Sequence, residues 1–191
     1  MLTGNIMIAS LFNGERVRLT ALRPEDAAVM ARWYEDGEFS RLWDALVARP
    51  RTEASLQKWF AETDSAKDGY AFGIRLLYSD ELIGYVDVDG IQWSHGAGWM
   101  AIAIGDPVNR SKGYGHEALK LVLKFAFHEL NLHRVQLTVF GYNEHAIKLY
   151  EKLGFQREGT FREFLARDGR RYDMYLYGLL RREWDAGVQQ G

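Results

Sequence analysis

The sequence predicts a single α/β domain, and three observations support this. The chain has 191 residues, of which 47% are hydrophobic, so it fits one domain with a sizeable buried core. Segments with strand-like alternation are interleaved with segments of helical periodicity. No internal repeat and no linker interrupts this order. We therefore expect an N-terminal extension over residues 1–15, one folded domain over 16–184 and a disordered tail over 185–191.

The expected strands are short apolar or alternating runs bounded by turn residues. Two of them are joined by Ser79-Asp80-Glu81, which is typical of a hairpin connection. The expected strands are residues 16–20, 71–78, 82–88, 99–104, 135–139 and 172–179.

The expected helices show apolar residues at a spacing of three to four. Pro24 stands where a helix start tolerates proline, Thr52 is a candidate N-cap, and Gly154 is a candidate C-terminal stop. The predicted helices therefore cover residues 24–34, 52–60, 119–130 and 146–153.

Composition excludes several classes of function. With 24 basic and 26 acidic residues the net charge is −2, so no basic field favours nucleic acid as a partner. No apolar run reaches about 18 residues, which argues against a membrane helix, and the N-terminus lacks the basic region of a signal peptide. The chain has no cysteine, which excludes disulfides, thiolate metal sites and a cysteine nucleophile and fits a cytoplasmic protein.

Histidine motifs do not predict a metal site. His116-Glu117 begins like the zinc-protease motif H-E-x-x-H, but Lys120 stands where the second histidine is required. His128 and His133 are five residues apart, about 140° around a helix, too far to share one metal ion. We therefore expect no metal.

The stretch Asn109-Arg-Ser-Lys-Gly-Tyr-Gly115 favours binding of an anion. Glycines at 113 and 115 allow backbone N–H groups to approach an oxyanion, and the following helix directs its positive dipole end to the same place. Taken alone, the loop is better explained as a basic surface turn than as an anion site. Residues 113–118 also match the dinucleotide pattern G-x-G-x-x-A, but eight residues separate Gly113 from Ile104, the end of the preceding strand, so a nicotinamide-dependent enzyme is the weakest alternative.

A second segment, residues 143–155, favours the anion-binding interpretation of the loop. Asn143 to Phe155 has the pattern N-x-x-A-x-x-x-Y-x-x-x-G-F, and Arg110 to Gly115 has the pattern R-x-x-G-x-G. Together, in this order, they resemble the GNAT superfamily of N-acetyltransferases over most of the chain, from about Val17 to Trp184. The resemblance is to the bacterial branch that acetylates ribosomal-protein N-termini and, in a sister group, polyamines.

The resemblance implies a mixed, mostly antiparallel sheet flanked by helices, with acetyl-CoA in a cleft between two splayed strands. It implies that Tyr150 is the general acid that protonates the departing thiolate, although this tyrosine also fits a core position. It implies that Asn143 binds the pantetheine arm, although Asn143 also fits an N-cap. The implied acetyl-CoA-binding residues are Ala103, Ile104, Gly105, Arg110, Ser111, Lys112, Gly113, Tyr114, Gly115 and Asn143.

One position departs from the family pattern. Many relatives carry a glutamate on the strand before the loop, and Trp99 stands at that place here. The usual base is therefore missing. Four carboxylates remain open as the source of a proton relay through water: Asp87, Asp89, Glu35 and Asp36.

The expected function is direct transfer of an acetyl group from acetyl-CoA to a primary amine. An α-amine of a peptide, protein N-terminus or small molecule is the preferred acceptor, because it needs a weaker base than a polyamine. The segment from Arg41 to Arg51, with three arginines and one aspartate, also disfavours a polycation. The alternatives are an acyl-CoA-binding sensor or scaffold without turnover and a polyamine N-acetyltransferase, with the protein a monomer or a homodimer.

Overall fold

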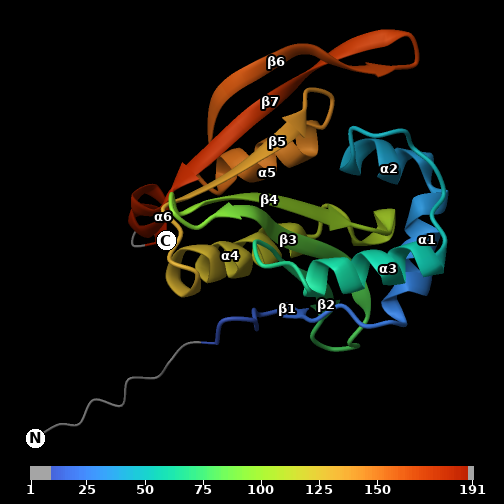
Figure 1. Cartoon of the computed structure of the whole chain (residues 1–191), viewed down its shortest axis with the longest axis horizontal. Coiled ribbons are helices and arrows are strands. Elements are labelled where there is room, and N and C mark those ends of the chain that lie inside the picture. The colour runs from blue at the N-terminus through green and yellow to red at the C-terminus, as the bar shows by residue number, and fades with distance from the viewer. Residues whose placement is uncertain (1–9, 189–191) are drawn as a thin grey trace, which may run out of the picture.

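The fold is built on one seven-stranded sheet with the strand order β1-β2-β3-β4-β5-β7-β6 (Figure 1). The computed structural model describes residues 10–188. The strands are β1 (Val17–Thr20), β2 (Tyr70–Leu76), β3 (Leu82–Gln92), β4 (Ala97–Ile104), β5 (Arg134–Phe140), β6 (Gln156–Arg167) and β7 (Arg170–Leu180).

Neighbouring strands run antiparallel everywhere except between β4 and β5, which run parallel. The expected mixed, mostly antiparallel sheet is confirmed. The parallel pair arises because the chain between β4 and β5 is long enough to form a crossover helix, whereas β2–β3 and β6–β7 are joined by short turns.

Helices cover both faces of the sheet. One core joins the sheet to α4, α5 and α6 and includes Leu119, Val122 and Phe127. The second core joins the other face to α1, α2 and α3 and includes Met30, Leu56 and Tyr85. The helices are α1 (Asp26–Glu35), α2 (Gly37–Trp43), α3 (Glu53–Asp64), α4 (Tyr114–Lys124), α5 (Glu144–Lys152) and α6 (Arg181–Val188), with a 3₁₀ turn at Pro107–Asn109 and a π-helical turn at Phe125–Glu129.

The predicted caps form as the sequence suggests. The Thr52 hydroxyl accepts a hydrogen bond from the Ser55 N–H at 3.2 Å and so begins α3. Gly154 follows α5 with a φ of +93°, the left-handed conformation that ends many helices. The predicted helix over 119–130 begins earlier, at Tyr114, and changes to the π-helical turn at Phe125.

Helices α2 and α6 and strand β6 were not predicted. Helix α2 is short and begins at a glycine, and it is capped by Asp36, whose side chain accepts from the Glu38 N–H. Strand β6 is an edge strand that is mostly exposed and interrupted by two register shifts, so its sequence lacks a clean alternation. The tail expected to be disordered from residue 185 is helical to Val188, and residues 189–191 lie outside the described part. Between residues 10 and 188 no helix is long and apolar enough to span a bilayer.

Candidate functional site

The site is organised by the divergence of β4 from β5. The two strands pair only at the start, where Ala97–Trp99 lie beside Arg134–Gln136. Beyond Trp99, β4 stays paired with β3 and β5 stays paired with β7. The second half of β4 therefore presents an open edge, which confirms the splayed strands that the sequence implied.

The register shows which groups occupy this open edge. The Gly105 N–H donates to the Ile83 carbonyl at 2.9 Å, and in an antiparallel ladder alternate residues point to the same neighbour. The backbone N–H of Ala103, which pairs with Tyr85, therefore points to β3, as that of Gly105 does. The backbone N–H groups of Ile102 and Ile104 point to the open edge. The resemblance implied acetyl-CoA-binding residues at Ala103 to Gly105. Of these, Ile104 has its backbone N–H at the open edge, as does Ile102, which was not among the implied residues.

Gly105 has a different role in the structure. A Cβ at this position would lie 2.0 Å from the Trp33 ring, so only glycine lets α1 pack against the end of β4. Its carbonyl accepts from the Arg110 guanidinium at 2.8 Å.

A cavity of about 1120 Å³ extends along this edge. Its wall includes β4 from Trp99 to Ile104, the loop and first turn of α4, the end of β5, and the start of α5. The predicted residues that line it are Ala103, Ile104, Arg110, Ser111, Gly113, Gly115, Asn143 and Tyr150. Gly105, Lys112 and Tyr114 do not line it.

The loop before α4 is shaped to present backbone donors. Ser111 and Gly113 have φ values of 59° and 84°, both in the left-handed region. Gly113 is the N-cap of α4, and the first intrahelical bond is that of the Glu117 N–H to the Gly113 carbonyl. The N–H groups of Tyr114, Gly115 and His116 are therefore unpaired by the helix and carry its positive dipole end.

Basic residues surround this helix start. Burial, followed by the charges of Lys152, Lys120 and Arg16, lowers the pKa of His116. A field that disfavours a protonated histidine favours an anion at the same place. Of these three cations the sequence indicated none, because they lie on three separate segments.

Two arginines fix the loop rather than point freely into the cavity. Arg110 donates to the carbonyls of Ile104 and Gly105 at 3.3 and 2.8 Å. Arg16 donates to the Lys112 carbonyl at 3.0 Å and pairs with Glu117 of α4 at 3.0 Å. The structure therefore gives Arg110 an anchoring contact that the motif alone does not reveal.

Asn143 and Tyr150 both face the cavity from α5. The Asn143 side-chain oxygen caps the helix by accepting from the Ala146 N–H at 3.2 Å, which leaves its NH₂ group to donate elsewhere. Tyr150 is buried, and among the described residues its hydroxyl has no hydrogen-bond partner. Burial, with the nearby charge of Asp87, raises the pKa of Tyr150 far above its usual value, so its phenol stays protonated.

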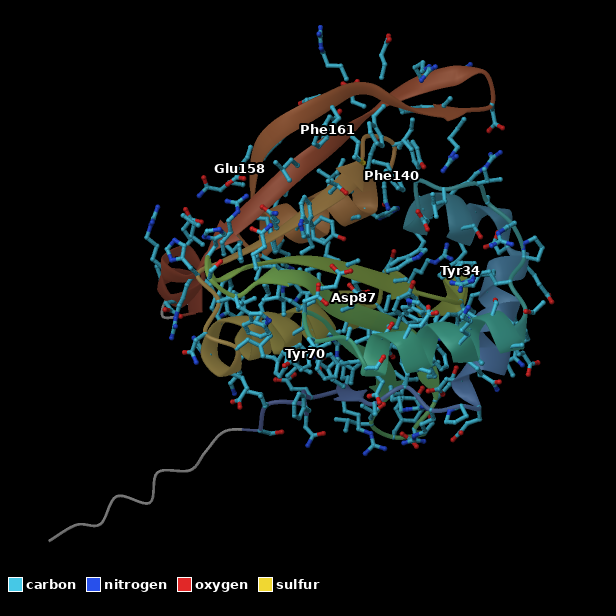
Figure 2. All side chains as sticks on the ribbon, viewed as in Figure 1. Tyr34, Tyr70, Asp87, Phe140, Glu158 and Phe161 are labelled. Atoms are coloured by element: carbon cyan, nitrogen blue, oxygen red, sulfur yellow. The ribbon has the colours of Figure 1, made fainter. Side chains whose placement is uncertain are left out.

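The structure separates the four candidate carboxylates. Glu35 and Asp36 line neither this cavity nor a second, smaller cavity that adjoins it. Asp87 is buried on β3, where Figure 2 labels it over the middle of the sheet, and it accepts from the Ala101 N–H at 3.1 Å. Burial, followed by the charge of Asp89, raises the pKa of Asp87 to about 7. Asp89 lines the cavity, and burial likewise raises its pKa.

A second cavity of about 430 Å³ adjoins the first and was not foreseen from the sequence. The two cavities share Trp43, Asp44, Asp89 and Ala101. Asp87 lies in the wall of the second cavity. The arrangement thus places a buried carboxylate and a buried phenol near the junction of two spaces.

The first cavity has features that fit acetyl-CoA. The first cavity offers an open strand edge at one end and unpaired N–H groups of α4 at the other. A Cβ at Gly115 would meet protein atoms only at 3.7 Å or more, so this glycine is not required by packing and leaves room on the cavity side. An extended pantetheine with a pyrophosphate fits these donors.

Known proteins with a similar sequence or structure carry the same fold. The acetyltransferase (GNAT) domain family matches residues 16–156. The N-acetyltransferase YokL of Bacillus subtilis is 31% identical over 94% of this chain and 98% of its own length, and the ribosomal protein uS5 alanine N-acetyltransferase of Escherichia coli is 27% identical over 92% and 96%. The spermidine N-acetyltransferase of Vibrio cholerae, solved with CoA and spermine, superposes with a TM-score of 0.79 at 23% identity over 88% of this chain and 97% of that one. The open β4 edge, the α4 loop and the family match agree, and the chain belongs to the GNAT family of acetyl-CoA-dependent N-acetyltransferases.

Proposed function

We propose that this enzyme transfers an acetyl group directly from acetyl-CoA to an α-amine of a peptide, a protein N-terminus or a small molecule. The observation that carries the proposal is the junction of the two cavities, where Asp87 and Tyr150 lie close enough for the charge of one to raise the pKa of the other. Acetyl-CoA occupies the first cavity and the amine enters from the second. The chain has no cysteine, so no thiol of the protein carries the acetyl group between them.

The chemistry divides between the two side chains. The amine nitrogen attacks the thioester carbonyl carbon, the carbon–sulfur bond breaks, and one outward N–H group of β4, that of Ile102 or Ile104, stabilises the carbonyl oxygen. The proton lost by the amine passes to Asp87, directly or through water. The Tyr150 phenol gives its proton to the departing thiolate.

The pKa of Asp87 favours an α-amine over a polyamine. A lysine-like amine with a pKa of about 10.4 costs about 4.6 kcal/mol to deprotonate at pH 7, whereas an α-amine with a pKa of about 8 costs about 1.4 kcal/mol. A base with a pKa of about 7, as Asp87 has, is suited to deprotonating an α-amine.

The arginines between residues 41 and 51 oppose a polycation less than the sequence implied. Arg41 pairs with Asp168 at 2.8 Å and does not face an acceptor. Asp44 and Asp89 line both cavities, so the acceptor side carries carboxylates as well as the remaining arginines. The preference for an α-amine therefore rests on the base and not on repulsion of a polycation. A sensor without turnover is disfavoured because Asp87 supplies the carboxylate that Trp99 does not.

The test is release of free CoA thiol with a panel of amines at pH 7, corrected for hydrolysis. We expect α-amines to exceed spermidine in kcat/KM. Tyr150→Phe keeps the ring and removes the proton donor, so kcat should fall by about 10²–10⁴ while acetyl-CoA affinity persists. Faster turnover of spermidine than of every α-amine would overturn the acceptor assignment, and a lack of turnover with every amine would favour the sensor.

A further inference from the structure

We propose that the second cavity binds a small amphoteric acceptor, a primary amine that also carries a carboxylate or another anionic group, with Arg49 and Arg51 binding the anion. The inference rests on the proposed function and specifies its acceptor. Nothing in the family match assigns this cavity.

The size and walls of the cavity suit a small molecule. Its volume of about 430 Å³ lies near the lower end of ligand sites, about 300–1,000 Å³, and suits an amino-acid derivative or dipeptide. Tyr85 forms the centre of an aromatic wall, with Trp43 at 4.5 Å and Trp59 at 5.4 Å between ring centroids, both edge-on. These rings favour an apolar or aromatic middle part of the ligand.

Ser40 supplies an independent sign of an absent ligand. This residue lines the cavity from α2 and is 5% exposed, and its hydroxyl oxygen has no hydrogen-bond partner among the described residues. A buried hydroxyl without a partner is destabilising, by roughly 1–3 kcal/mol. A polar ligand in this cavity is positioned to satisfy it.

The cavity wall carries two aspartates on the sheet and two arginines on the segment after α2, which begins with a third aspartate, Asp44. Asp87 and Asp89 belong to β3, beside the junction with the first cavity. Arg49 and Arg51 belong to the segment between α2 and α3. Figure 2 shows Asp87 over the sheet and Tyr34, a neighbour of Arg51, away from it on α1. A ligand that places its amine at the two aspartates of β3 can therefore place its anionic group at the two arginines.

The two arginines are available for a ligand. Among the described residues neither Arg49 nor Arg51 forms an ion pair, whereas Arg41 of α2 does. The Arg51 guanidinium lies 5.3 Å from the centre of the Tyr34 ring, and its one hydrogen bond, to the Ser55 carbonyl, is long at 3.4 Å. A planar guanidinium held against a ring keeps its remaining donors for a carboxylate.

The test compares two ligands that differ only in the anion. Alanyl-phenylalanine has an α-amine, an aromatic ring and a free carboxylate, and its C-terminal amide lacks the charge. We expect kcat/KM to be about tenfold or more higher for the free acid than for the amide, equivalent to about 1.4 kcal/mol. In the double variant Arg49→Gln/Arg51→Gln the ratio should fall to about one. Arg32→Gln, an exposed arginine of α1 outside both cavities, should keep the ratio of the unaltered enzyme.

Calorimetry with CoA bound gives a second readout that needs no turnover. The free acid should bind more tightly than the amide, and only the double variant should lose the difference, with thermal unfolding used to verify that it folds. Equal kcat/KM and equal affinity for acid and amide would overturn the inference while leaving the proposed function intact. Arginine-dependent binding without acetylation would uphold this site and contradict the proposed function. Equal efficiency with a longer peptide amide would favour a protein N-terminus instead.

Discussion

Asp87 shows how burial converts an ordinary carboxylate into a group that titrates near neutral pH. Its side chain is buried on β3, with one hydrogen bond from the Ala101 N–H to offset the loss of water. Burial and the charge of Asp89 disfavour the ionised form, and the pKa rises to about 7. The environment that suits Asp87 to the base role we propose therefore makes its ionisation destabilising to the fold.

The predicted consequence is a pH dependence of stability with a defined sign. In the folded state Asp87 binds a proton more tightly than in the unfolded chain, where its pKa is near 3.8. Its protonated form therefore contributes stability that is fully present below about pH 4 and is lost as the pH rises through about 7. Within that window the loss is up to about 1.4 kcal/mol per pH unit.

Urea unfolding of the natural chain and of Asp87→Asn between pH 4 and 8 measures this effect. The asparagine keeps a side-chain oxygen for the Ala101 N–H and does not titrate, so the difference in unfolding free energy should shift in favour of the variant as the pH rises. Parallel stability curves for the two proteins would contradict the assigned environment of Asp87.

At the residue scale, the sequence motifs predicted which residues lie at the site better than they predicted where the side chains point. The spacing of Asn143 and Tyr150 placed both on one helix, and both face the cavity. Arg110 belongs to the same motif, yet its guanidinium holds backbone carbonyls, because the turn of the chain after β4 brings those carbonyls within reach. The choice of Asp87 over Glu35 required the fold, since burial on β3 has no signal in a single sequence.

The loop and helix α4 act as one element. Gly113 is needed for the backbone itself, because its φ of 84° is unfavourable for other residues and a Cβ would lie 3.0 Å from the Arg16 guanidinium. Gly115 has no positive φ and no close protein neighbour. The two glycines of the motif thus have separate roles, one in the turn and one toward the cavity.

This difference yields a prediction for Gly115→Ala. The added methyl group contacts Ile104 and Leu149 at an ordinary 3.7 Å, so the free energy of unfolding should not decrease. It also narrows the space before the unpaired N–H groups of α4, and acetyl-CoA affinity should drop by about tenfold, or about 1.4 kcal/mol. Calorimetry gives the affinity and thermal unfolding gives the stability. A loss of stability with unchanged affinity would mean that Gly115 serves packing and not the ligand.

Element types were predictable where periodicity was strong, as in α4, α5 and β5. They were not predictable where tertiary contacts replace local pattern. Strand β6 is exposed along most of its length and exists because β7 pairs with it. Helix α2 is seven residues long and packs Phe39 into the core beside Trp33 and Tyr34. Both elements border the cavities, so the acceptor side was the part of the site least accessible to sequence reasoning.

Across the whole molecule, the tip of the β6–β7 hairpin reaches the segment that follows α2. Figure 1 shows the hairpin arching over the sheet toward α2. Arg167 donates to the carbonyls of Asp44 and Leu46 at 3.0 and 3.2 Å, and Asp168 pairs with Arg41 at 2.8 Å. These contacts join two segments that are far apart in the sequence. They lie beside the proposed acceptor site, because Asp44 and Leu46 line the second cavity.

The final prediction tests whether this connection sets acceptor binding. Arg167→Gln shortens the donor that holds the segment after α2. Arg170→Gln alters an exposed arginine of the same hairpin whose side chain has no hydrogen bond among the described residues. We expect Arg167→Gln to raise the acceptor KM several-fold and to leave the acetyl-CoA KM unchanged, because the α4 loop is held separately by Arg16 and Arg110. Unfolding free energy should change by no more than about 1.5 kcal/mol, the usual contribution of a hydrogen bond. A parallel rise in both KM values, or the same effect from Arg170→Gln, would show that the hairpin supports the fold as a whole rather than the acceptor side.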